Sequence, residues 1–330
     1  MKKIVLTVSA IICAVCTGCL KQEKSGYEEN NVKGALTINV EGAVQNTSKA
    51  SGTASQSDED RVGSVQIFLF SEDGKIEVQA YSGNSSVTIV STMGRKTLGV
   101  VVNCPEIAGV TRLSELNSKL TLLQDNAPDS FVMYKTQTVD MDAAQKSVDV
   151  KVKRLVCKIV VKKISNRMTL EAYRGSPVRI KGIYLINVAG EASMDCSAVP
   201  GVWLNRIEKE SSTNSLYAEF PSAVSIAYNE DDISGHYFYC YPNPVEEDSS
   251  AAQWSARHTR LVIEAEVDGK TCYYPATLPV LEPNKVYIVN DFVLTRVGTD
   301  KADEVTATGN MDFFLQIEPW GEEYMDNVTI

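Results

Sequence analysis

The side chains best suited to proton transfer are few and scattered in this sequence. Among its 330 residues only His236 and His258 are histidines, and imidazole is the side chain that exchanges protons near neutral pH. Glu264 and Glu266 alternate along a predicted strand and resemble a glycosidase carboxylate pair, but any solvent-facing strand shows that spacing. The sequence contains no P-loop, no nucleophile elbow and no HExxH motif. We therefore expect that the chain is not an enzyme and has no catalytic residues.

The cysteines give no clear metal or disulfide pattern. Three of the eight lie in the first 19 residues, and the other five are Cys104, Cys157, Cys196, Cys240 and Cys272. No CxxC spacing occurs, and five cysteines cannot all pair with one another. We expect no metal site and no cofactor, and we interpret most of these cysteines as buried thiols that pack like small apolar residues.

The N-terminus has the pattern of an export signal. Lys2 and Lys3 precede an apolar run over residues 4–15, which is too short to span a bilayer as a helix. Thr17 and Gly18 then stand directly before Cys19, as in a bacterial lipobox. We predict a signal peptide over residues 1–18 and a lipid on Cys19; the alternative is an ordinary signal peptide that contains a cysteine.

The charge of the chain argues against two kinds of partner. The formal net charge of −10 becomes about −12 once Lys2 and Lys3 leave with the signal peptide. Nothing in so acidic a composition suggests binding to nucleic acid or to anionic lipid headgroups through a basic patch. We therefore expect no nucleic-acid partner, and we expect acyl chains to provide any membrane anchor.

The mature chain is predicted to begin with a tether, a strand and a long loop. Residues 19–33 are polar and lack periodicity, which is typical of a flexible tether. Residues 35–44 alternate, with Leu36, Ile38, Val40 and Val44 on one face. Residues 45–60 are rich in Ser, Thr, Gly, Asn and Asp, and loops of that length are often functional or cut by proteases.

The remaining sequence predicts an all-β protein. Short alternating segments recur with turn residues between them, and Asp268-Gly269 joins two of them as a two-residue hairpin loop. Leucines at 113, 116, 120 and 123 predict one amphipathic helix of about three turns. The strand-like stretch 148–164 is too long for one ordinary strand, which places a bend or domain boundary near Arg154. We predict two β-sandwich domains, at 34–154 and 155–330.

The order of several segments resembles a known family. These segments are SVQIFLF at 64–70, GRKTLGVVVN at 94–103, VKRLVCKI at 152–159, CYYP at 272–275, EPNKVY at 282–287 and QIEPW at 316–320. Together with the lipobox, the tether and the early strand, they are similar to the major fimbrial subunits, the fimbrillins that build type V pili on Gram-negative anaerobes. The resemblance extends over nearly the whole chain.

The resemblance implies a fold and a route of assembly. The fold would be two transthyretin-like β-sandwich domains in tandem, with one short amphipathic helix in the first. The chain would reach the outer membrane as a lipoprotein, a surface protease would remove its first strand, and a strand from another subunit would replace it in a cell-surface fimbrium. The family is cut after an arginine in the loop that follows the first strand. Lys49 stands at that place here, so the cut falls at Lys49, or at Arg61, or does not occur.

The residues themselves provide a mechanism for such an exchange. Burying Leu36, Ile38, Val40 and Val44 would stabilise the first domain by roughly 6–10 kcal/mol, at about 1.5–3 per side chain. Loss of the strand would leave a groove and a sheet edge that a strand from another copy, or from a related fimbrial subunit, can fill. Head-to-tail filling propagates as a filament. Val328 and Ile330 alternate around Thr329 and are either the donor strand or the last strand of the second domain.

Two other functions remain open at this stage. One is an uncut accessory subunit of the fimbria, either a cell-proximal anchor or a tip adhesin that supports adhesion. The other is a surface glycan-binding lipoprotein, in which Trp203, Trp254 or Trp320 would stack on sugars.

Overall fold

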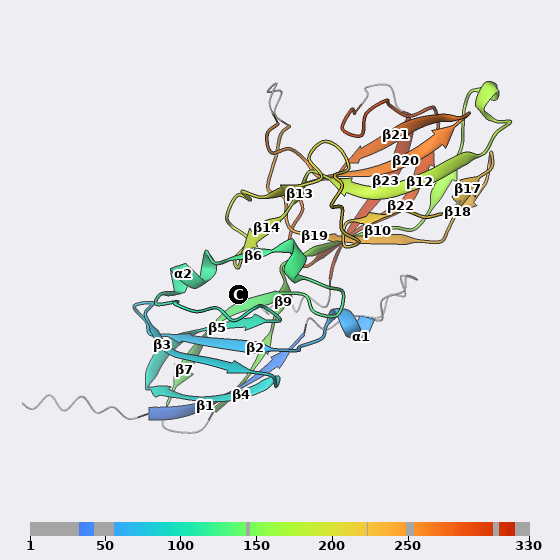
Figure 1. Cartoon of the computed structure of the whole chain (residues 1–330). Helices are drawn as coiled ribbons and strands as arrows, with labels where there is room; N and C mark the ends of the chain where they lie inside the picture. Colours follow the sequence, from blue (N-terminus) through green and yellow to red (C-terminus); the bar gives the residue numbers. More distant parts are fainter. Residues whose placement is uncertain are drawn as a thin grey trace, which may run out of the picture. The chain divides into compact units, whose positions relative to one another are not determined.

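The computed structural model describes residues 33–42, 56–142, 146–222, 224–248, 254–305 and 310–320 (Figure 1). Several residues singled out above lie outside these ranges, namely Cys19, Val44, Lys49, Val328 and Ile330. Within the described residues no helix is both long and apolar enough to cross a membrane.

Two sheets pack face to face in the first part of the chain. The smaller has the strand order β4 (Ser86–Thr92), β1 (Lys33–Glu41), β8 (Lys146–Lys151). The larger has the order β3 (Ile76–Ser82), β2 (Val65–Phe70), β5 (Gly94–Val102), β7 (Met133–Met141), β9 (Lys153–Arg154). Their inward side chains form one apolar cluster, to which Leu36, Ile38 and Val40 of β1 belong.

Two further sheets, of six and five strands, form the second part of the chain. One has the order β18 (Asp231–Asp232), β11 (Ile164–Asn166), β22 (Lys285–Leu294), β10 (Cys157–Val161), β19 (His236–Cys240), and β23 (Met311–Pro319) also pairs with β22. The other has the order β16 (Ala218–Glu219), β12 (Val178–Ile186), β20 (Arg260–Val267), β21 (Lys270–Thr277), and β17 (Val224–Ile226) also pairs with β12. Within these four sheets, the strands up to Arg154 and those from Cys157 onward lie in different sheets (Figure 1). This fold is the all-β tandem sandwich that the sequence predicts.

The β2 strand is buried on both faces, which explains why its sequence is apolar at nearly every position. Val65, Ile67 and Leu69 face the cluster shared with β1. Phe68 and Phe70 point to the opposite side, into a second cluster that continues through the strands from Cys157 onward. A strand that is buried on both faces shows a continuous apolar run rather than alternation.

The predicted three-turn helix is shorter than the leucine spacing suggests. The helix α2 covers only Leu113–Asn117, and the chain then forms the strand β6 (Leu120–Leu122) and a 3-10 turn (Leu123–Asp125). The β6 strand pairs with β14 (Glu191–Ser193), so its backbone bonds to a distant segment instead of continuing the helix. Leu116 is buried as predicted, but Leu120 is half exposed.

The loop predicted at 45–60 also ends differently from the prediction. Its last residues form the single-turn helix α1 (Gln56–Glu59), and Glu59 is buried. The acidic run 58–60 is therefore not simply a solvated loop. The remaining short elements are β13 (Val188–Ala189), which pairs with β15 (Trp203–Leu204), and a 3-10 turn at Glu171–Tyr173.

The hairpin predicted at Asp268-Gly269 is present. Val267 pairs with Lys270, so the loop between β20 and β21 has two residues. Both loop residues have positive φ, 49° at Asp268 and 78° at Gly269. Positive φ at both positions is the requirement of a type I′ turn, whose twist matches that of the paired strands.

Candidate functional site at the first strand

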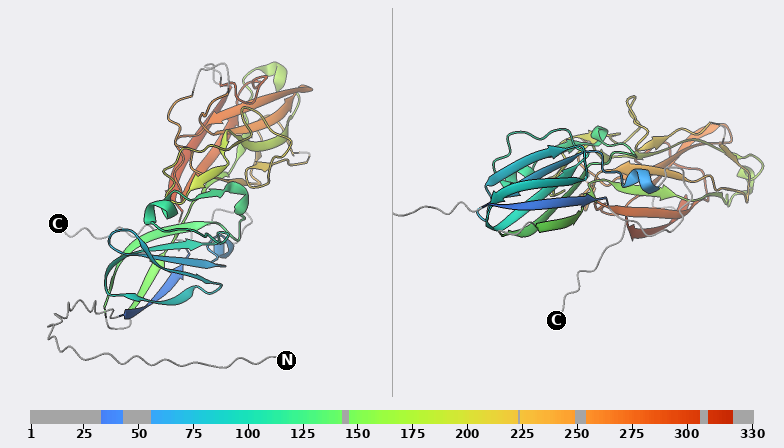
Figure 2. Two further views of the ribbon diagram at one scale, coloured as in Figure 1. Left: turned by 60° about the vertical axis from the view of Figure 1, so that its left-hand side comes forward. Right: turned by 90° about the horizontal axis from the view of Figure 1, so that it is seen from below.

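The first strand is the central strand of its sheet. It pairs antiparallel with β4 from Lys33 to Asn39 and parallel with β8 from Leu36 to Glu41. Figure 2 shows β1 (blue) running along the sandwich, with α1 near its far end. Removal of β1 would therefore leave two unpaired strand edges facing one another, where the sequence alone suggested one. We call this gap between β4 and β8 the β1 slot.

The inward face of β1 is anchored by three apolar side chains. Leu36 is 2% exposed, Ile38 is fully buried and Val40 is 4% exposed. At about 1.5–3 kcal/mol per side chain, these three contribute roughly 5–9 kcal/mol, an upper estimate because the unfolded chain is already partly compact. The outward face is polar: Thr37 shares a hydrogen bond with Thr88 at 3.0 Å, and Asn39 donates one to Asp149 at 2.9 Å.

Glycines bound the apolar face at both ends. A Cβ on Gly34 would lie 2.2 Å from the carbonyl oxygen of Asp142, and a Cβ on Gly42 would lie 2.1 Å from that of Asp60. Both distances are far below van der Waals contact, and in each case the obstacle is backbone rather than a movable side chain. The backbone of β1 can therefore approach its neighbours this closely only because these positions have no side chain.

A buried ion network lies at the Gly42 end of the strand. Arg154 is fully buried, donates from Nε to the carbonyl oxygen of Glu59 at 3.0 Å, and forms an ion pair with Asp60 through Nη2. Its Nη1 donates to the side-chain oxygen of Asn284 and to the carbonyl oxygen of Trp320, each at 3.1 Å. One guanidinium thus joins three segments that are far apart in the sequence.

The Glu59 side chain ties the same region to the second part of the chain. Its carboxylate accepts a hydrogen bond from Lys158 Nζ at 2.6 Å and another from the hydroxyl of Tyr239. Tyr239 in turn stacks on the Trp320 ring, with centroids 5.7 Å apart, and the Arg154 guanidinium carbon lies 4.3 Å from that ring. We call the set the Arg154 junction: Glu59, Asp60, Arg154, Lys158, Tyr239, Asn284 and Trp320.

The charges of the junction stay paired at neutral pH. Burial raises the pKa of Asp60 to about 6; the Arg154 guanidinium opposes this rise and the Glu59 carboxylate adds to it. Burial also lowers the pKa of Arg154, which nevertheless remains protonated because guanidinium is so strong a base. Removing one partner would leave the other as an uncompensated buried charge, which costs about 3–5 kcal/mol.

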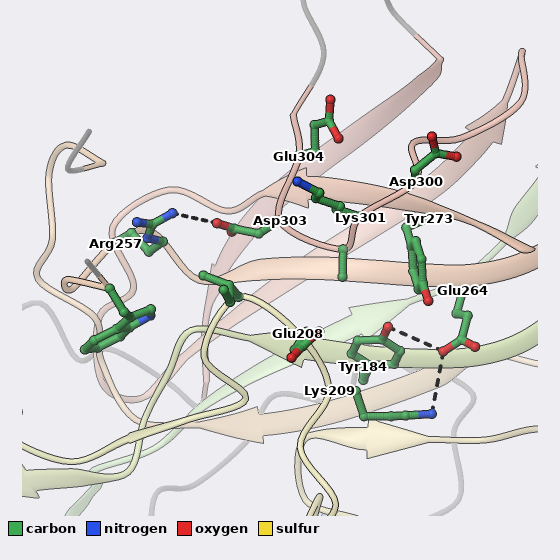
Figure 3. A pocket seen from close by; sticks show the side chains of 13 residues that line it. Tyr184, Glu208, Lys209, Arg257, Glu264, Tyr273, Asp300, Lys301, Asp303 and Glu304 are labelled. Carbon is green, nitrogen blue, oxygen red and sulfur yellow. Dashed lines mark hydrogen bonds and ion pairs between the residues drawn. The ribbon is translucent and has the colours of Figure 1, made fainter. Parts of the chain in front are cut away.

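A pocket lies on the sheet that contains β12 and β20, away from the first strand (Figure 3). It has a volume of about 640 Å³ and is lined mainly by charged and aromatic side chains. Tyr184 donates to Glu264 at 3.4 Å, Lys209 lies 3.6 Å from Glu264, and Arg257 pairs with Asp303 at 2.7 Å. Four of the eight charged side chains that line this pocket thus pair with one another.

The three tryptophans do not form one sugar-binding platform. Trp254 lines the pocket of Figure 3, and its ring centroid is 5.7 Å from that of Trp203. Trp320 is only 3% exposed and belongs to the Arg154 junction, so it cannot stack on a sugar. Within the ranges that the structure describes, no three His, Cys, Asp or Glu side chains are grouped so that they could hold a metal ion.

Solved structures with a similar fold include fimbrial proteins and candidate cell-adhesion proteins. The crystal structure of the fimbrilin FimA from Porphyromonas gingivalis superposes with a TM-score of 0.61 at 12% identity, covering 87% of this chain and 97% of that one. The chain has the fimbrilin fold. A candidate cell adhesion protein from Bacteroides eggerthii gives a TM-score of 0.65 at 17% identity, covering 88% and 98% of the two chains. The tip fimbrial protein Mfa3 of P. gingivalis gives 0.52 at 14% identity, covering 87% and 100%.

These comparisons show the fold and agree with the expectation that the chain is not an enzyme, since the structures named are fimbrial and adhesion proteins. No protein-family model matches the sequence, and no curated protein matches it either. The likeness to the fimbrilin fold therefore rests on structure.

Only some of the predicted site residues lie in the part of the chain that the structure describes. Leu36, Ile38 and Val40 lie together on the inward face of β1, whereas Arg61 is exposed and pairs loosely with Asp129 at 3.8 Å. The Arg154 junction was missed from the sequence. One signal was present: Arg154, Lys158, Asn284 and Trp320 all belong to segments that carry the family resemblance.

Proposed function

We propose that this chain is a structural subunit of a cell-surface fimbria and that it polymerises by exchanging its first strand for a strand of another subunit. The observation that carries the proposal is the position of β1, which is central in its sheet and holds three buried side chains. The likeness of the fold to a fimbrilin and to a tip fimbrial protein supports it.

The β1 slot specifies what kind of segment would replace β1. Two facing edges offer backbone hydrogen bonds on both sides, and the pockets of Leu36, Ile38 and Val40 require apolar side chains at alternate positions. A strand supplied by a second subunit meets both needs. Because the donating and accepting surfaces differ, such pairing continues from copy to copy and produces a fibre.

We place the maturation cut after Lys49 rather than at Arg61. The carbonyl oxygen of Arg61 accepts a hydrogen bond from Asn103 Nδ2 at 2.7 Å, and the next residues are held as well, because Gly63 N donates to Asn103 Oδ1 at 2.8 Å. A protease needs a segment that it can extend in its own cleft, and this backbone is tied down. Lys49 lies in the polar stretch between β1 and α1.

The Arg154 junction would hold the new N-terminus in place after the cut. Glu59 and Asp60 are bound to Arg154 and Lys158, so the new N-terminal segment would stay attached while β1 leaves. The chain on either side of Arg154 forms the two domains at 34–154 and 155–330. The junction then maintains their contact after processing.

The segment after Trp320 is our candidate donor strand. Trp320 N donates to the Asn284 carbonyl oxygen at 2.9 Å, which fixes the point where this segment begins. At least ten residues follow, including Val328 and Ile330. At about 3.3 Å per residue they could span roughly 33 Å, close to the length of the nine-residue strand β1.

Before assembly, the precursor would be held at the outer membrane by a lipid on Cys19, with the residues from 19 up to the start of β1 at Lys33 as tether. A surface protease is the further partner that this route requires. N-terminal sequencing of fimbria-associated protein tests the proposal: we expect the mature chain to start at Ala50, and Lys49→Ala to keep the chain uncut while Arg61→Ala leaves processing unchanged. A fimbrial chain that still starts at acylated Cys19 would contradict strand removal and indicate an uncut anchor or tip subunit.

The pocket of Figure 3 supports one second candidate, glycan binding by a surface lipoprotein. Its aromatic lining includes Trp254, Tyr184 and Tyr273, and aromatic faces stack on sugar rings. Binding of the full chain to a glycan array that is lost in Trp254→Ala would favour this function. Binding that is absent, or equal in both proteins, would remove it.

A further inference from the structure

Two of the cysteines face each other across neighbouring strands of the second part of the chain. Cys157 at the start of β10 is the register partner of Cys240 at the end of β19. Their sulfur atoms lie 3.4 Å apart, and both side chains are buried. The pairing is not evident from the sequence, in which the two residues are 83 positions apart.

The backbone at this position already has the spacing of a disulfide. Directly opposite residues of an antiparallel pair have Cα atoms about 4.5 or 5.5 Å apart, depending on the hydrogen-bonding position. Disulfides require a Cα separation of roughly 4.4–6.8 Å and a sulfur–sulfur bond of about 2.05 Å. Small side-chain rotations would therefore bring the sulfur atoms into bonding distance without a change in strand pairing.

We propose that Cys157 and Cys240 form a structural disulfide in the exported chain. The predicted export signal at residues 1–18 would direct the chain to a compartment in which disulfides can form, so this proposal rests on the export step of the proposed function. One thiolate attacks the disulfide of a thiol–disulfide oxidoreductase and forms a mixed disulfide. The second thiolate then displaces the enzyme as a dithiol, so two electrons and two protons leave the chain as the new S–S bond forms.

The bond forms before folding is complete and is protected afterwards. Burial raises the pKa of Cys157, and little thiolate is available once the strands have packed. The same burial shields the finished bond from reductants. Cys196 is the competing partner: burial, the Asp195 carboxylate and Cys157 itself raise the pKa of Cys196 to about 12. The register of β10 and β19 favours Cys240, because only that residue is held directly opposite Cys157.

The disulfide would also reinforce the Arg154 junction. Lys158 and Tyr239, the next pair of the same ladder, are the two residues that hold the Glu59 carboxylate. Closing a loop of 83 residues restricts the unfolded chain strongly. We expect the bond to raise Tm by about 5–15 °C in a chain of this size.

Peptide mapping tests the pairing directly, because trypsin separates all five cysteines. Cys157 falls in the peptide 155–158, Cys240 in 210–257, Cys196 in 182–206, Cys104 in 97–112 and Cys272 in 271–285. The full chain is exported to a bacterial periplasm, denatured without reductant, alkylated and digested. We expect 155–158 to be recovered joined to 210–257, with the other three cysteines alkylated. Alkylation of both Cys157 and Cys240, or a link from Cys157 to 182–206, overturns the proposal.

Thermal unfolding provides an independent measurement. Wild-type protein refolded in a thiol reductant should have a Tm about 5–15 °C below that of untreated protein. The double variant Cys157→Ala and Cys240→Ala should show no difference between the two treatments, which separates loss of the bond from loss of packing. Cys104→Ala is the matched control, a buried cysteine outside the pair, and should keep the full difference. Equal Tm values for treated and untreated wild-type protein contradict the proposal.

Discussion

Shortening Ile38 to alanine tests how strongly β1 is held. Ile38 is fully buried between its register partners Val87 of β4 and Val148 of β8. The change removes three carbon atoms, which costs about 2.4 kcal/mol in transfer free energy at 0.8 per methylene. The cavity left behind adds to this, and buried Ile→Ala changes cost about 2–5 kcal/mol in total. We expect that loss in the free energy of unfolding of the uncut chain, measured by urea denaturation.

The same substitution has a second readout once the loop is cut. A protease site placed between residues 45 and 55 leaves β1 bound without a covalent link. A loss of 2–5 kcal/mol then corresponds to about 30- to 4,000-fold weaker binding of the cut segment to the rest of the chain, at 1.4 kcal/mol per tenfold. Size-exclusion chromatography measures it as the fraction of the segment that elutes with the protein.

The neighbouring residue provides the matched control. Thr37 points outward and loses only an exposed hydrogen bond to Thr88 when it is changed to alanine, which costs about 0.5–1 kcal/mol. If Ile38→Ala and Thr37→Ala destabilise the chain equally, or if Ile38→Ala costs less than 1 kcal/mol, the inward side chains do not hold the strand and the reasoning fails.

Three further outcomes are expected. Arg154→Met should lower the free energy of unfolding by about 3–5 kcal/mol, because it leaves the Asp60 carboxylate without its ion-pair partner and removes the hydrogen bonds to Glu59, Asn284 and Trp320. Arg95→Met at an exposed position should change it by less than about 0.5 kcal/mol. Burial opposes ionisation of Glu77, but hydrogen bonds from a lysine and two hydroxyls outweigh it and lower the pKa of Glu77. The ionised carboxylate therefore stabilises the folded chain above the unfolded-state pKa of about 4.3, and this stabilisation is lost as the pH falls further. In acid titrations, the free energy of unfolding of the wild-type protein should fall more steeply below that pH than that of Glu77→Gln. Gly42→Ala should cost about 1–3 kcal/mol by urea denaturation, and Gly83→Ala, which has open space around it, almost nothing; equal effects would contradict the close backbone approach.

The first strand shows what sequence can establish. Alternation over 35–44 predicts which side chains point inward, because successive residues of a strand face opposite sides. Leu36, Ile38 and Val40 are buried as that pattern requires. The pattern does not specify neighbours, and the central position of β1 between β4 and β8 follows from pairings with residues up to 110 positions away.

The predictions that were wrong, the long helix and the end of the 45–60 loop, failed because distant segments of the chain bond to these residues. The leucine spacing after Leu113 fits a helix, but β6 instead bonds to β14, a segment about 70 residues further along the chain. Glu59 and Asp60 have the composition of a solvated loop, but Glu59 is buried against Lys158 and Asp60 is half-buried against Arg154. Local composition does not reveal a partner that only the tertiary fold supplies, and the same holds for Cys157 and Cys240.

The glycines at the two ends of β1 act as a filter on any strand that would take its place. Gly34 and Gly42 lie eight residues apart on the same side of the strand as Leu36, Ile38 and Val40, and each lies against a backbone carbonyl. An incoming strand that follows the same path must match this spacing, with apolar residues at every second position and no side chain at either end, or it must be short enough to avoid both ends. If subunits exchange strands as proposed, the two glycine positions would restrict which donor sequences can occupy the β1 slot, and subunits of different sequence would differ in their ability to join one fibre.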